Sequence, residues 1–211
     1  MLGTRNAARA CARRGMRLIH VSTDFVFDGE QEEALSEASA PRPIEWYGQT
    51  KLWAEEEARA APDCIIVRIA FPYAPPPAPK ADLAQKIAAN LRQGKPCHLF
   101  ADQIITPTFA PDIAQGLLLL ARAGEAGELF HLAGADSLSP LQFGRETARA
   151  FGLDEGLILP SSLADYLKTD PRPRQRCLRL SNAKWAAFAA SHGLAAPLGA
   201  REGLRRIAEK Q

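Results

Sequence analysis

"VSTDFVFDG", residues 21–29, contains the end of an apolar run, "MRLIHVS" (16–22), and the polar groups that follow it. A near-continuous apolar run of this length predicts a buried strand of a parallel sheet. Ser22, Thr23 and Asp24 stand at its carboxyl end, and buried hydroxyls and carboxylates cost free energy unless something pairs with them. Open α/β sheets bind their ligands at this end of their strands. The stretch therefore predicts one edge of a ligand site.

The rest of the chain alternates between strand-like and helix-like segments. Further apolar strands are predicted at 64–71 and 127–134, with a short one at 97–100. The predicted helices are 6–15, 46–61, 81–94, 112–124, 139–152, 181–193 and an Arg-rich helix that begins at 201. Alternation of this kind is typical of parallel strands joined by helical crossovers, so the pattern predicts an α/β fold. About three buried strands are few for a doubly wound sheet.

Composition excludes several classes of function. The 211 residues are 46% hydrophobic and 24% charged, and their formal net charge is +2, so no strong field recruits nucleic acid or an anionic membrane. The longest apolar stretch, 116–121, is too short to cross a bilayer, and the first residues lack the apolar core of a secretion signal. Four scattered cysteines and no clustered histidines predict reduced thiols, no metal site and a cytoplasmic location.

Tyr47 and Lys51, in "YGQTK", are four residues apart on a predicted helix and share one face. An ammonium beside a phenol favours the phenolate, so we expect the pKa of Tyr47 to fall and the phenol to exchange a proton with a carbonyl near neutral pH. Thr23 could hydrogen-bond the same carbonyl oxygen. Both features have simpler explanations, namely a chance Tyr–Lys spacing and a strand-end threonine that bonds its own backbone.

Three motifs together resemble the extended short-chain dehydrogenase/reductases, and more narrowly the dTDP-4-dehydrorhamnose reductase family. They are "VSTDFVFDG" (21–29), "YGQTKLWAEE" (47–56) and "DQIITPT" (102–108). The chain departs from the family's pattern at Phe25, where the family has Tyr, and at Thr50, where it has Ser.

The resemblance implies a reductase of 4-keto nucleotide sugars that uses NADP(H) or NAD(H) and serves dTDP-rhamnose biosynthesis. Thr23 and Tyr47 would hold the C4 keto oxygen, with Tyr47 as proton donor, while Lys51 tunes Tyr47 and binds the nicotinamide ribose. The implied cofactor contacts are Ser22, Tyr47, Lys51 and Phe71. The implied substrate contacts are Asp24, Arg68, Asp102, Gln103, Pro107, Thr108 and Arg172.

The resemblance also implies a partial Rossmann-like, doubly wound parallel sheet with a small C-terminal α/β substrate lobe. Residues 1–73 and 104–135 would form the Rossmann-like domain, and 74–103 and 136–211 the lobe. No glycine-rich phosphate turn follows a strand in this sequence, and the first strand here corresponds to the family's fourth. We therefore expect weak cofactor binding and an open edge on the first strand. The chain is then a fragment or a mis-started product of a longer reductase, or a short relative, and that edge could pair with another chain or form a homo-oligomer.

Two rival functions stay open. A nucleotide-sugar epimerase of the same superfamily is one, although "DQIITPT" argues against it. The other is a non-catalytic interaction protein on the same fold, as the regulatory β subunit of methionine adenosyltransferase is. The missing glycine-rich turn favours this second rival, whereas Thr23, Tyr47 and Lys51 oppose it. Neither the sugar nor the choice between NADH and NADPH follows from the sequence.

Overall fold

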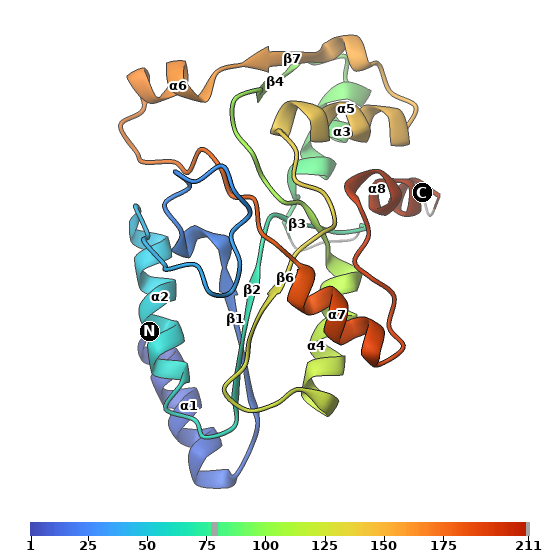
Figure 1. Ribbon diagram of the computed structural model, residues 1–211. Coiled ribbons are helices and arrows are strands. Elements are labelled where there is room, and N and C mark those ends of the chain that lie inside the picture. The colour runs from blue at the N-terminus through green and yellow to red at the C-terminus, as the bar shows by residue number, and fades with distance from the viewer. Residues whose placement is uncertain (77–79, 210–211) are drawn as a thin grey trace.

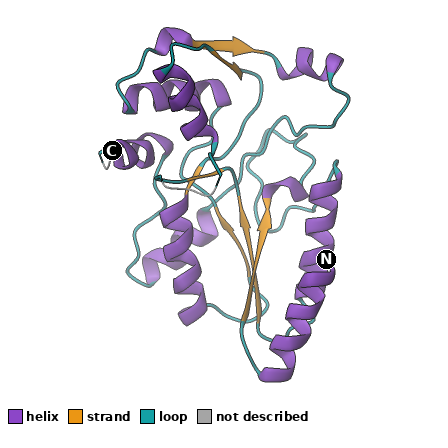
Figure 2. Cartoon of the chain, turned by 180° about the vertical axis from the view of Figure 1, so that it is seen from behind, coloured by secondary structure: helices purple, strands orange, loops and turns teal. Residues whose placement is uncertain are grey.

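The computed structural model describes residues 1–76 and 80–209, so residues 77–79 and 210–211 of the predicted lobe lie outside the described residues. In the described part, a main sheet contains three parallel strands, β1 (Leu18–Thr23), β2 (Cys64–Ile69) and β6 (Leu129–Leu132), in the order β1-β2-β6 (Figures 1 and 2). These are the three apolar runs of the sequence, so the predicted α/β fold with a parallel sheet is confirmed.

Helices cover both faces of this sheet (Figure 1). Helices α1 (Leu2–Arg14) and α2 (Trp46–Ala58) pack on one face, where Ile66 is fully buried against alanines of both helices. On the other face lie α4 (Ala110–Ala123) and α7 (Ala183–Ser191), whose Trp185 packs against β6. Because successive strand residues point to opposite faces, a strand covered on both sides must be apolar throughout, which is why the runs are continuous.

A second group of elements lies beyond the carboxyl ends of β1 and β2 (Figures 1 and 2). It contains two short parallel pairs, β3 (Pro72–Tyr73) with β5 (Thr108–Phe109) and β4 (Cys97–Phe100) with β7 (Ile158–Ser161). Its helices are α3 (Leu83–Arg92), α5 (Pro140–Ala150), α6 (Leu163–Thr169) and α8 (Ala200–Ala208). We call this group the lobe; its own core contains Tyr73, Phe143 and Leu204.

Helix α7 does not belong to that core. It falls within 136–211, the range expected to form the lobe, but its apolar face packs on the main sheet. The division of the chain into two domains stays a prediction, and α7, β3 and β5 all depart from the predicted ranges.

Local signals placed most helices correctly. Ser139 caps α5: its Oγ accepts from the Gln142 backbone amide at 3.1 Å, and the Gln142 side-chain oxygen accepts from the Ser139 amide at 2.7 Å. Strands β3, β5 and β7 and helix α6 were not predicted, because each is short and β7 contains Pro160. No helix in residues 1–76 and 80–209 combines the length and apolar character that a membrane crossing requires.

Candidate active site

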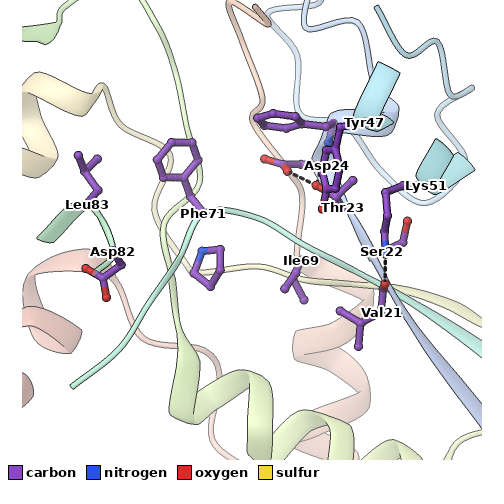
Figure 3. Close-up of a pocket in the computed structure, with 12 residues that line it drawn as sticks. Val21, Ser22, Thr23, Asp24, Tyr47, Lys51, Ile69, Phe71, Asp82 and Leu83 are labelled. Atoms are coloured by element: carbon purple, nitrogen blue, oxygen red, sulfur yellow. Dashed lines mark hydrogen bonds between the residues drawn. The ribbon is translucent and has the colours of Figure 1, made fainter. Parts of the chain in front are cut away.

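A cavity of about 380 Å³ opens at the carboxyl ends of β1 and β2, between the sheet and the lobe (Figure 3). Thr23 reaches it from the end of β1, and Tyr47 and Lys51 reach it from α2. The structure thus brings together three residues that were predicted from two separate motifs. The remaining lining residues are Val21, Ser22, Asp24, Phe25, Ile69, Phe71, Pro72, Asp82 and Leu83.

The first turn of α2 is held tightly against the short helix η1 (Asp24–Val26). Glu45 caps α2 by accepting from the backbone amides of Tyr47, at 2.8 Å, and Gly48. Gly48 has no Cβ, and a Cβ there would overlap the carbonyl oxygen of Phe25. This close approach brings the Phe25 and Tyr47 rings into an edge-to-face contact, 5.9 Å between centroids, and fixes where Tyr47 enters the cavity.

Lys51 is anchored to the strand rather than to the phenol. Its Nζ donates to the Val21 carbonyl oxygen at 2.7 Å. Burial lowers the pKa of Lys51, and the nearby Glu55 carboxylate opposes that fall. The expected drop in the pKa of Tyr47 is wrong in this geometry. Burial raises the pKa of Tyr47, a Thr23 hydrogen bond partly opposes this, and the charges of Asp24 and Glu45 raise it further.

Thr23 and Asp24 form a hydrogen-bonded pair at the end of β1. The Thr23 hydroxyl donates to Asp24 Oδ1 at 2.9 Å and accepts from the Phe25 backbone amide at 3.3 Å. The simpler explanation of Thr23, a bond to its own turn, therefore also holds. Asp24 is only 2% exposed, and its burial raises the pKa of the carboxyl to about 7.

A buried ion pair lies under the site. Arg68 Nε and Nη2 donate to the two oxygens of Glu55 at 2.9 and 2.8 Å, and Ser22 Oγ donates to Glu55 Oε1 at 2.5 Å. Although burial alone would raise it, hydrogen bonds from Arg68 and Ser22 hold the pKa of Glu55 below its usual value. Ser22 and Arg68 face each other across the sheet, in register with His131 on β6.

This geometry limits what two of the predicted contacts can do. Arg68 is 3% exposed and lines neither this cavity nor the one beside it in the described part of the chain, so it supports the site from below instead of touching substrate. Ser22 lines the cavity, but its hydroxyl is committed to Glu55. Both side chains point toward the face of the sheet that α2 covers, and there they bond to Glu55.

A second cavity, of about 580 Å³, adjoins the first and shares Phe25 and Phe71 with it. Two of the predicted substrate contacts, Gln103 and Arg172, line this second cavity. The Gln103 side-chain amide donates to the Gln175 carbonyl oxygen at 2.8 Å, and the Arg172 guanidinium pairs with Asp170.

Three other residues of the "DQIITPT" motif were also predicted to contact substrate. In the structure they bond to, or pack against, other parts of the protein. Asp102 accepts from the Leu163 backbone amide at 2.6 Å and from two further donors at the start of α6. Thr108 is buried and accepts from the Gly134 amide at 3.1 Å, and Gly134 packs directly on the Pro107 carbonyl. In the described part of the chain, Asp102, Pro107 and Thr108 line neither cavity.

Several lining residues were not predicted. Asp82 and Leu83 reach the first cavity from the start of α3, and Trp46 and Arg174 line the second. The sequence could have identified Asp82 as the N-cap of α3. It could not have placed Asp82 at the cavity, because that depends on how the lobe packs against the main sheet. Phe71, a predicted cofactor contact, lines both cavities with a positive φ of 39°, which a non-glycine residue rarely adopts.

The comparisons with known proteins agree with the motifs. Residues 1–194 match the family model described as the RmlD substrate binding domain. The probable low-salt glycan biosynthesis reductase of Haloferax volcanii is 38% identical over 179 residues, which cover 83% of this chain and 59% of that protein. The dTDP-4-dehydrorhamnose reductase of Mycobacterium tuberculosis (strain H37Rv) is 34% identical over 195 residues, which cover 87% and 61%.

The fold also matches solved structures. The dTDP-4-dehydrorhamnose reductase of Bacillus anthracis, solved in complex with NADP, superposes with a TM-score of 0.87 over the whole of this chain and 71% of that chain, at 23% identity. The chain spans about three fifths of the length of the two curated relatives, 59% and 61%. It belongs to the RmlD substrate binding domain family, and the resemblance to the dTDP-4-dehydrorhamnose reductases is confirmed.

Proposed function

We propose that this chain carries the catalytic centre of a reductase that converts a 4-keto nucleotide sugar to the alcohol at the expense of NADPH or NADH. The observation that carries the proposal is that Thr23, Tyr47 and Lys51 line one cavity at the carboxyl edge of a parallel sheet. The names of the curated relatives, which include dTDP-4-dehydrorhamnose reductases, support the same reaction class.

The residues around the first cavity fit a nicotinamide ring and its ribose. The volume of the cavity is in the range of small-ligand sites. Its walls are mainly apolar, and the ammonium of Lys51 lies among them. Lys51, Tyr47, Phe71 and the Ser22 backbone would hold the cofactor, which when bound supplies hydride to the carbonyl carbon.

The chain's own residues manage the proton. Tyr47 donates its phenolic proton to the carbonyl oxygen, and the Thr23 hydroxyl steadies that oxygen. The raised pKa of Tyr47 keeps the phenol protonated at neutral pH, as a proton donor requires.

The second cavity would receive the nucleotide diphosphate. Arg172 and Arg174 line it, and a guanidinium matches two phosphate oxygens at once. The Trp46 side chain, in a residue that is 72% exposed, is available there to stack on a base or a sugar. Because Phe25 and Phe71 border both cavities, a sugar placed between them would present its keto group to Tyr47.

We also infer that these 211 residues alone bind the dinucleotide weakly. The sequence contains no glycine-rich turn between a strand and a helix, which is the usual cradle for the pyrophosphate. Strand β1 pairs with β2 alone in the described part of the chain, so its free edge is the surface for further strand pairing.

The experiment is to follow NADPH oxidation by the chain with a dTDP-4-keto-6-deoxy sugar, at saturating cofactor, and to identify the product. We expect the 4-hydroxy sugar, and we expect Tyr47→Phe to lose at least a hundredfold in kcat while still binding the nucleotide sugar. Tyr73→Phe is the matched control, because the Tyr73 hydroxyl lies in the lobe core near Ala200. An epimerised product would favour the epimerase, and binding without any turnover would favour the interaction protein.

A further inference from the structure

The hydrogen bond between Thr23 and Asp24 conflicts with the role proposed for Thr23. A threonine hydroxyl has one hydrogen to donate, and a carboxylate can only accept. With Asp24 ionised, the hydrogen of Thr23 is committed to Asp24 Oδ1, 2.9 Å away. The carbonyl oxygen of a keto sugar is also only an acceptor, so Thr23 would have nothing to offer it.

The surroundings of Asp24 remove this conflict. Asp24 is 2% exposed, it lines the first cavity, and its second oxygen, Oδ2, has no hydrogen-bond partner among the described residues. An ionised carboxylate buried in this way is costly unless a cation pairs with it, and no lysine or arginine of residues 1–76 and 80–209 forms an ion pair with Asp24.

The other charged and titratable groups around the first cavity come from two helices. Helix α2 contributes Tyr47, Lys51 and the capping Glu45, and Asp82 lines the same cavity from the start of α3. The ammonium of Lys51 is engaged with the Val21 carbonyl, and the two carboxylates do not stabilise a further negative charge. Burial raises the pKa of Asp24 to about 7, and the hydrogen bond from Thr23 is the largest effect that opposes the rise.

We propose that Asp24 is a positioning residue that works as a neutral carboxylic acid, donating its own hydrogen to Thr23 Oγ1 so that the Thr23 hydroxyl is free to donate to the carbonyl oxygen of the substrate. This inference rests on the ketoreductase function proposed above. The hydrogen stays on Asp24 throughout, so the proton that enters the product still comes from Tyr47.

Ionisation of Asp24 would weaken the reaction in two ways. It withdraws the hydrogen of Thr23 from the substrate, and it places a negative charge beside an oxygen that becomes negative in the transition state. The same charge raises the pKa of Tyr47 and makes the phenol a weaker acid. The reductase should therefore lose activity as the pH rises through about 7.

The first test is the pH dependence of kcat for the full chain and its variants. We expect an alkaline loss of activity with a midpoint near 7 in the wild type, and we expect the kcat of Asp24→Asn to show no such loss across that range, because the amide NH₂ donates to Thr23 at every pH. Asp24→Leu should lose at least tenfold in kcat at all pH values, with little change in KM. Asp28→Asn is the matched control in the same loop: Asp28 is buried but pairs with Arg42, and its loss should leave the limb in place.

The second test needs no turnover. Carbon-13 NMR of aspartate side chains, with the Asp24 signal assigned by its absence in Asp24→Asn, should show a carboxyl that titrates near 7. An Asp24 that titrates near its ordinary value of 3.8, or an alkaline limb that survives in Asp24→Asn, would overturn the proposal. Titration near 7 in a chain that reduces no keto sugar would support the neutral acid and count against the reductase function, so the two failures are distinguishable.

Discussion

Loss of the Glu55 carboxylate should destabilise the fold more than any other single loss of charge on α2. The Glu55 and Arg68 side chains are each 3% exposed, and they share two hydrogen bonds of 2.8 and 2.9 Å. Glu55→Gln leaves a buried guanidinium without a counter-charge, and its Nη1 already has no partner among the described residues. Breaking such a pair from one side costs about 3–5 kcal/mol, a large part of the roughly 5–15 kcal/mol that holds a domain together.

The assay is equilibrium unfolding in urea, followed by tryptophan fluorescence. Glu57→Gln, two residues further along α2, is the matched control: Glu57 pairs with Arg5 at the surface, where an ion pair is worth about 0–1 kcal/mol. The double variant Glu55→Leu with Arg68→Met should recover most of the loss, because it removes both charges and fills the space with apolar groups. The reasoning fails if Glu55→Gln and Glu57→Gln lower the free energy of unfolding by the same amount.

Three further predictions concern the walls of the site. Gly48→Ala should push α2 away from η1, because the new Cβ overlaps the Phe25 carbonyl oxygen. We expect kcat to fall at least tenfold and a crystal structure of the variant to show the displaced helix. Because the folded-state pKa of Asp24 lies above its ordinary value, the free energy of unfolding should fall as the pH rises from about 4 to about 7, by roughly 4 kcal/mol at most. Urea titrations across that range should show the slope flattened in Asp24→Asn, and an unchanged slope would contradict the assignment. Phe71→Gly should cost less than about 2 kcal/mol in unfolding, since glycine relieves the strain of a φ of 39°, while calorimetry should show weaker binding of the nucleotide sugar.

The sequence predicted the structure well where interactions between residues close together along the chain decide it. Apolar runs predicted the three main strands, and Tyr47 and Lys51 lie on one face of α2 because the helical repeat requires it. Ser139, the first residue of the helix predicted at 139–152, is the N-cap of α5. These features depend on neighbours within about four positions along the chain.

The sequence was less informative where a partner that is distant along the chain decides what a side chain does. Arg68 looks like a cationic ligand in the sequence, but Glu55 on α2 neutralises it inside the protein. Asp102 looks like a substrate contact, but the amides at the start of α6 use its carboxylate, and α6 itself was not predicted. The direction of the pKa shift at Tyr47 was wrong because it depends on how deeply the phenol is buried and on where the ammonium of Lys51 points.

The central claim is that Tyr47, beside Thr23 and Lys51, delivers a proton while a carbonyl in this cavity receives hydride. The most direct measurement supplies NADPH deuterated at the transferable position, together with a dTDP-4-keto-6-deoxy sugar, and follows deuterium at C4 of the sugar by NMR. We predict deuterium at C4 with the wild-type chain, and at least a hundredfold slower appearance with Tyr47→Phe at undiminished nucleotide-sugar binding. Transfer at the same rate in both proteins would contradict the account.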